Sequence, residues 1–134
     1  MFLNQLNPAE KEAFISLSFH AANANGIIED SEYEILEEYC KEMGISFFDA
    51  RNVVDMDRIV GVFSDSEEKN KKLVLLETLG LLHVDGSYDE QEKIFLTDFA
   101  KKIGIDEKDI EIYVSLIERY LQLVKEMVDA LTRG

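Results

Sequence analysis

The sequence predicts an all-α fold, a single domain of about six to seven helices built from two pseudo-two-fold helix-turn-helix repeats. The 134 residues include a single proline, which favours long helices over β structure with many turns. Apolar residues recur at steps of three and four, as they do along one face of a helix. A pattern also recurs after sixty residues, and internal repeats fix architecture more firmly than other sequence signals.

The two copies of the repeat run from Ala24 to Ile45 and from Val84 to Ile105. Residues matched at a spacing of sixty are Gly26 and Gly86, Glu32 and Glu92, Leu36 and Leu96, Lys41 and Lys101, Gly44 and Gly104, and Ile45 and Ile105. We therefore expect one domain over residues 1–134, with halves of about 8–63 and 64–134 that superpose.

Asn7, Pro8 and Glu10 predict the start of the first helix. Asn7 can cap it, Pro8 suits the first helical position, and Glu10 can close a capping box. The helix should run to about Ala24, because Gly26 can adopt the positive φ that ends a helix.

A second helix is expected from near Asp30 to Gly44, a residue type typical of a helix C-terminus. Ser46 can cap a shorter helix that reaches Val54. Residues 55–63 fit either a short helix or an irregular connector, so the pattern leaves this stretch open.

The next helix opens at Ser64–Glu68, since acids favour the first turn. It is apolar nearly all round as far as Leu82, which predicts a helix surrounded by others. Gly80 would let a neighbouring helix approach closely. Glu77 is expected at an edge of the bundle, because a buried carboxylate needs partners.

Gly86 ends that helix, and the following one should start near Asp89 and run to Ile103. Asp106 can then cap a last helix that continues to Arg133, since no glycine or proline interrupts it. Such a helix is about 40 Å long if straight, which is long for a domain of this size.

The last helix carries two apolar stripes. One runs from Ile110 to Leu131 and should face the core, and the second comprises Tyr113, Leu116, Tyr120, Leu123 and Met127. The second stripe either meets the connector at residues 56–63 or pairs two chains. We favour the connector and hence a monomer, with a dimer as the alternative.

The formal net charge is −14, from 14 basic and 28 acidic side chains. Such a surface repels phosphate backbones, which argues against nucleic-acid binding. It suits cations or a basic protein partner, although solubility alone also explains it. Cys40 is the only cysteine, so an intrachain disulfide and a thiolate zinc cluster are both excluded.

No segment of the sequence predicts insertion into a membrane. Residues 1–8 lack the basic and apolar regions of a secretory signal. No apolar run reaches the roughly 18 residues of a membrane span. We therefore expect a soluble, cytoplasmic protein.

The acidic residues at the two repeated turns allow two interpretations. They can cap helices, since Asp89 and Glu92 have the spacing of a capping box. They can also bind a divalent cation such as Ca²⁺ or Mg²⁺, with oxygen ligands from Asp85, Asp89 and Glu92 and, more weakly, from Asn25, Glu29 and Glu32. An EF-hand loop would place Leu81 and Ala21 at the first ligand position, and both are apolar.

Residues that would indicate an enzyme are not apparent. The sequence lacks a Ser-His-Asp arrangement, a phosphate-binding glycine loop and a zinc signature. His20 and His83 are isolated, and we expect both to be structural. The sequence therefore predicts a non-enzymatic protein that requires no cofactor.

The paired units of Asp-Gly or Asn-Gly, a glutamate six positions later and then Gly-Ile resemble the TerB family of bacterial tellurite-resistance proteins. The resemblance extends from about Phe14 to Ile105, and the module is also similar to that of DjlA-type co-chaperones. It implies an acidic helical protein of the stress response. It further implies divalent-cation binding by clustered acids and protein partners at the membrane. Asn25 departs from the usual aspartate.

Overall fold

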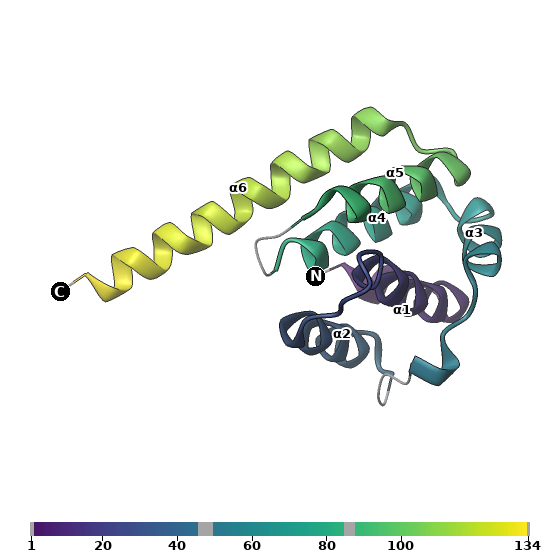
Figure 1. Ribbon diagram of the computed structural model, residues 1–134, viewed down its shortest axis with the longest axis horizontal. Coiled ribbons are helices and arrows are strands. Elements are labelled where there is room, and N and C mark those ends of the chain that lie inside the picture. Colours follow the sequence, from purple (N-terminus) through teal and green to yellow (C-terminus); the bar gives the residue numbers. More distant parts are fainter. Residues whose placement is uncertain (1, 46–49, 85–87, 134) are drawn as a thin grey trace.

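The computed structural model describes residues 2–45, 50–84 and 88–133. Within these residues the fold is all-α, without strands, as predicted, and its elements are shown in Figure 1. The helices are α1 (Pro8–Ala22), α2 (Asp30–Met43), α3 (Met56–Ser64), α4 (Glu68–Leu82), α5 (Glu90–Lys102) and α6 (Glu107–Thr132), with two short 3₁₀ turns, η1 (Leu3–Gln5) and η2 (Ala50–Asn52).

Two pairs of helices have bounds or starts that differ by sixty residues, the spacing of the repeat in the sequence. Adding 60 to the bounds of α1, 8 and 22, gives those of α4, 68 and 82. The starts of α2 and α5, at 30 and 90, differ by the same amount. The third helices differ, because α3 has 9 residues and α6 has 26. Superposition of the two halves in space stays a prediction.

Helix α4 is the centre of the bundle, as its apolar sequence predicts. It contacts α1, α2, α3, α5 and α6, and Leu75, Leu79 and Leu82 on it are fully buried. A Cβ added to Gly80 would lie 3.7 Å from the Ile117 side chain, an ordinary contact distance. The neighbouring helix therefore does not require a glycine there.

Glu77 is buried in the bundle, so the prediction that it lies at an edge is wrong. Its carboxylate accepts a 2.9 Å hydrogen bond from the backbone amide of Phe2. Its own carbonyl accepts a 2.7 Å bond from the Tyr39 hydroxyl. The two bonds tie α4 to the N-terminal segment and to α2, and the bond from Phe2 gives the buried carboxylate a partner.

Residues 55–63, for which the sequence pattern left two possibilities, include a helix, α3, rather than an irregular connector. Asp55 caps it, accepting a 2.9 Å bond from the Arg58 amide. Its Phe63 ring packs edge-on against Phe99 of α5, with centroids 6.2 Å apart. The predicted helix before it starts at Ser46, outside the described residues, and the chain is not helical at Val54.

Two glycines end helices as the repeat predicts. Gly44 and Gly104 follow α2 and α5 with φ of +76° and +83°, values that suit glycine best. After each, the next amide donates a 2.8 Å bond to a carbonyl five positions back. Gly26 also has a positive φ, of +85°, whereas Gly86 lies outside the described residues.

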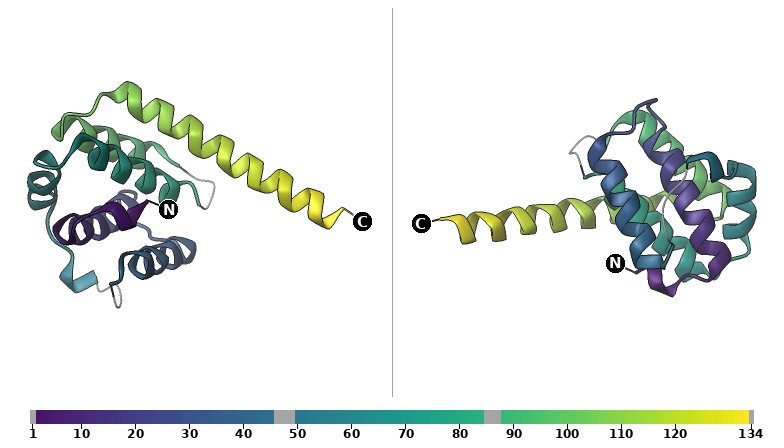
Figure 2. Two further views of the ribbon diagram at one scale, coloured as in Figure 1. Left: turned by 180° about the vertical axis from the view of Figure 1, so that it is seen from behind. Right: turned by 90° about the horizontal axis from the view of Figure 1, so that it is seen from below.

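Helix α6 runs beside α4 and α5 and then projects far beyond them (Figures 1 and 2). Ile110, near its start, is the only residue of α6 that is buried. Leu116, Tyr120 and Met127 are 40, 50 and 50% exposed. These residues belong to the second apolar stripe of α6, which residues 56–63 were predicted to cover. This prediction is wrong, because residues 56–63 lie in α3, which packs mainly against α1.

Within residues 2–45, 50–84 and 88–133, none of the helices combines the length and apolar character that crossing a membrane would need.

Candidate functional site

The two turns of the repeat are joined by one hydrogen bond between side chains. The Asn25 amide, after α1, donates to the Asp89 carboxylate, at the start of α5, over 2.7 Å. The Asn25 side-chain oxygen accepts a 3.0 Å bond from the Ile27 amide, which holds the turn. An aspartate at position 25 would place two carboxylates together, so the asparagine suits the observed geometry.

Asp89 and Glu92 form the predicted capping box. The Asp89 carboxylate accepts from the Glu92 amide at 2.9 Å, and the Glu92 carboxylate accepts from the Asp89 amide at 3.0 Å. The pKa of Asp89 is lowered, first by the bond from the Glu92 amide and then by the bond from Asn25. Glu92 is 2% exposed, so its carboxylate is aimed at the backbone and away from solvent.

Glu29 and Glu32 have matching positions at the start of α2. The buried Glu32 carboxylate accepts a 2.9 Å bond from the Glu29 amide, and the Glu32 amide donates to the Glu29 carbonyl at 3.0 Å. Both predicted glutamates at sixty-residue spacing therefore face the backbone of their own helix.

The described residues of these turns form helix caps. Asp85 lies outside the described residues. Among the residues that are described, no three carboxylate, imidazole or thiol groups gather where they could hold a metal ion. Each oxygen of Asp89 already accepts a hydrogen bond. Ca²⁺ takes six to eight oxygens, more than Asn25, Asp89 and Glu92 present together.

The two histidines have backbone partners. The His20 ring lies 2.8 Å from the Val54 carbonyl, and His83 Nδ1 lies 2.7 Å from the Leu79 carbonyl one turn earlier. His83 stacks on Tyr88 with centroids 4.6 Å apart. The buried Tyr88 hydroxyl has no hydrogen-bond partner among the described residues, and burial, followed by the Glu92 charge, raises its pKa to about 12.

Cys40 is buried. Burial first, and then the Glu37 charge, raise the pKa of its thiol. A thiol shifted in this direction is a poor nucleophile, because the thiolate is the reactive form.

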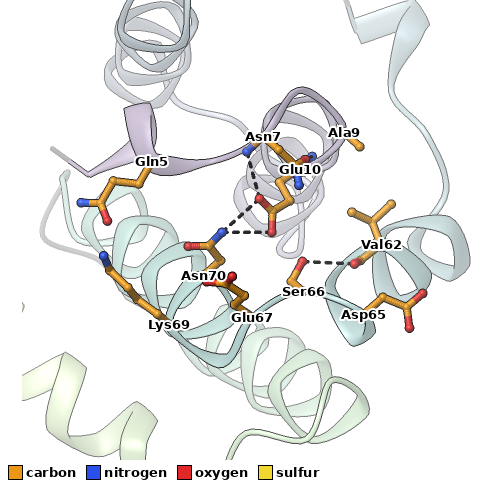
Figure 3. A pocket seen from close by; sticks show the side chains of 10 residues that line it. All are labelled: Gln5, Asn7, Ala9, Glu10, Val62, Asp65, Ser66, Glu67, Lys69 and Asn70. Carbon is orange, nitrogen blue, oxygen red and sulfur yellow. Dashed lines mark hydrogen bonds between the residues drawn. The ribbon is translucent and has the colours of Figure 1, made fainter.

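A polar pocket of about 700 Å³ lies between the starts of α1 and α4 (Figure 3). At its wall the buried Glu10 carboxylate accepts from the Asn7 amide at 2.9 Å and from the Asn70 side chain at 3.0 Å. Glu10 and Asn70 occupy equivalent positions of the repeat. The bonds explain the buried carboxylate as a link between two helices.

Exposed apolar side chains form a stripe on α6. We define the α6 stripe as Leu116, Tyr120, Leu123, Met127 and Leu131, all of them exposed. Where α6 still lies against the bundle, the stripe borders a groove of about 300 Å³ that is also lined by Phe2, Leu76 and Gly80. An apolar surface of this extent is typical of an interface with another molecule.

Sequence reasoning found the capping residues but missed their long-range partners. The Asn25–Asp89 and Glu10–Asn70 contacts join residues 64 and 60 positions apart, and no local spacing indicates them. Comparison of the chain with protein-family models, curated proteins and solved structures gives no significant match.

Proposed function

We propose that this chain is a non-enzymatic, acidic helical scaffold that holds another protein chain against α6. The observation that carries the proposal is the α6 stripe. The projecting part of α6 has little of the bundle to pack on, and most helical stability in proteins comes from packing an apolar face. A partner that covers the stripe would supply that packing.

The setting we propose is stress handling in the bacterial cytoplasm, of the kind that the TerB resemblance implies. Its support is the repeated Gly26…Glu32 and Gly86…Glu92 pattern and the net charge of −14. The charge suits a protein partner with a basic surface around its contact, including one held at the membrane, and opposes nucleic acid.

We propose that the acidic turns mainly cap helices. The support is the pair of reciprocal bonds between Asp89 and Glu92 and the matching bond from the Glu29 amide to Glu32. A second candidate, a divalent-cation response, is supported by the TerB resemblance and by the acidic residues Asp85, Asp89 and Glu92 that follow one another closely in the sequence.

Thermal melting distinguishes the two roles of the turns. If they only cap, millimolar Ca²⁺, Mg²⁺ or Mn²⁺ leaves the melting temperature of the wild-type protein unchanged. Glu92→Gln then retains much of the stability, because an amide oxygen still accepts the Asp89 amide. A rise in melting temperature with one cation that Glu92→Gln abolishes would instead establish the cation response.

The scaffold proposal is tested by cross-linking at the stripe. Met127 is replaced by a photo-crosslinking amino acid in the full chain, produced in its native host, and Gln122, on the polar side of α6, is replaced in a matched control. We expect a discrete cross-linked product from position 127 and none from position 122. Folded protein that gives no product at position 127 would contradict the scaffold function.

A further inference from the structure

We infer that the occupant of the α6 stripe is a second copy of this chain, with the two α6 helices packed antiparallel about an axis near Gln122. This inference rests on the proposed scaffold function and names its partner. Three observations carry it. They are the self-complementary charges of α6, the distribution of net charge along the chain, and the groove that continues the stripe.

The charges at one edge of the α6 stripe are self-complementary. On a helix of 3.6 residues per turn, Arg119 and Glu126 lie along the edge of the stripe that faces away from the bundle. Both side chains are exposed. This edge therefore holds one base and one acid, seven residues apart.

An antiparallel pair places this edge against the same edge of the second copy, in the reverse direction. Arg119 then faces Glu126 of the other copy, with a centre between residues 122 and 123. The two-fold symmetry repeats this contact, so the dimer has two attractive charge pairs about one axis.

The net charge of the chain favours the antiparallel direction over the parallel one. Residues 118–133 hold three acids and three bases, so this segment is neutral and the whole charge of −14 lies in the remainder. A parallel pair would place two strongly negative bundles side by side. An antiparallel pair keeps the bundles at opposite ends of the paired helices, where water and salt screen their repulsion.

The groove beside α4 gives the end of the second α6 a place to pack. With the axis near Gln122, Met127 of one copy lies opposite Ile117 of the other, at the groove bordered by Phe2 and Leu76. The stripe of each copy therefore covers the stripe and the groove of the other, and the contact is used twice in the dimer.

The first test measures mass in solution by light scattering at low micromolar concentration. We expect about 31 kDa, twice the 15.4 kDa of one chain. Met127→Glu and Tyr120→Glu should each give a monomer, since both place a charge within the apolar contact. Gln122→Glu adds the same charge on the polar side and should remain a dimer. Met127 lies on the projecting part of α6, so a retained cooperative melt of Met127→Glu would show that the bundle still folds.

The second test determines direction by exchanging charges. Arg119→Glu brings a second negative charge to Glu126 of the other copy and should weaken the dimer roughly tenfold at low salt, since two attractive pairs become repulsive. Adding Glu126→Arg should restore the affinity of an antiparallel dimer. In a parallel dimer, this edge of the stripe faces the opposite, apolar edge of the other copy, at Ile117 and Val124. Neither exchange would then make or break a charge contact, and the affinity would change little.

These outcomes separate this inference from the scaffold function. A wild-type monomer at tens of micromolar, a dimer that survives Met127→Glu, or a double exchange that fails to restore affinity would overturn the inference. If the purified chain is monomeric while position 127 cross-links to a different protein in cells, the scaffold function stands and the second copy is not the occupant.

Discussion

The side-chain amide of Asn25 donates a hydrogen bond to the carboxylate of Asp89, 64 residues later in the chain, over 2.7 Å. The bond links the turn after α1 to the first turn of α5. Asn25 and Asp89 thereby form a polar contact in which an amide and a carboxylate are complementary and two carboxylates would repel.

Replacing Asn25 by aspartate should therefore destabilise the fold. Asn25→Asp exchanges a hydrogen bond for a repulsion, and we expect a loss of about 1 kcal/mol in the free energy of unfolding at neutral pH. Urea titration measures it, with Asn25→Ala as the control for loss of the bond alone. Equal stability of the two variants would show that repulsion from Asp89 is negligible.

The lowered pKa of Asp89 predicts a specific pH dependence. Because the pKa is lower in the folded state than in the unfolded state, ionised Asp89 stabilises the fold fully above its unfolded pKa of about 4. This contribution is lost as pH falls through the folded value. The difference in melting temperature between wild type and Asp89→Asn should be constant from pH 7 to 5 and shrink at lower pH. A difference unchanged at acidic pH would refute this account.

Removal of the hydroxyl should lower the stability of the protein at Tyr39 but not at Tyr88. Tyr39→Phe deletes the buried 2.7 Å bond to the Glu77 carbonyl and should cost about 1–2 kcal/mol of stability. Tyr88→Phe removes a buried hydroxyl that lacks a partner among the described residues, so stability should be unchanged or higher. Chemical denaturation of both variants tests the pair, and a clear loss for Tyr88→Phe would indicate an unseen partner.

The glycines after α2 and α5 should tolerate alanine poorly. Gly44→Ala and Gly104→Ala force an L-residue to a positive φ, and each should destabilise by about 1 kcal/mol. Gly61→Ala is a suitable control, because Gly61 lies inside α3 and an added Cβ would meet no atom within 4 Å among the described residues. It should stabilise slightly. Equal effects at all three positions would contradict the conformational argument.

The features of this fold that could be predicted from the sequence are those that depend on residues close together in the chain. The cap at Asn7, the box at Asp89 and the helix end at Gly44 each depend on residues within one turn, and all three are present. The Asp55 cap of α3 is harder to recognise, because no glutamate follows at the third position to mark a capping box.

The rest of the fold depends on tertiary packing, which the spacing of residues in the sequence does not specify. The periodicity of α6 identifies its apolar positions but cannot say where the bundle that would cover them ends. For the same reason the expected contact between the α6 stripe and residues 56–63 is wrong, since these residues form a helix that packs on α1. The contacts Asn25–Asp89 and Glu10–Asn70 are likewise products of how the helices meet.

The central position of α4 also determines which backbone amides exchange most slowly with solvent. The amides of residues 73–82 lie where α4 is buried among five other helices, so we expect their protons to exchange with solvent only when the whole bundle unfolds. The amides of the projecting end of α6 are released by local fraying, which costs far less free energy. A single protein of 134 residues should thus show the slowest and the fastest helical exchange on two helices that touch each other.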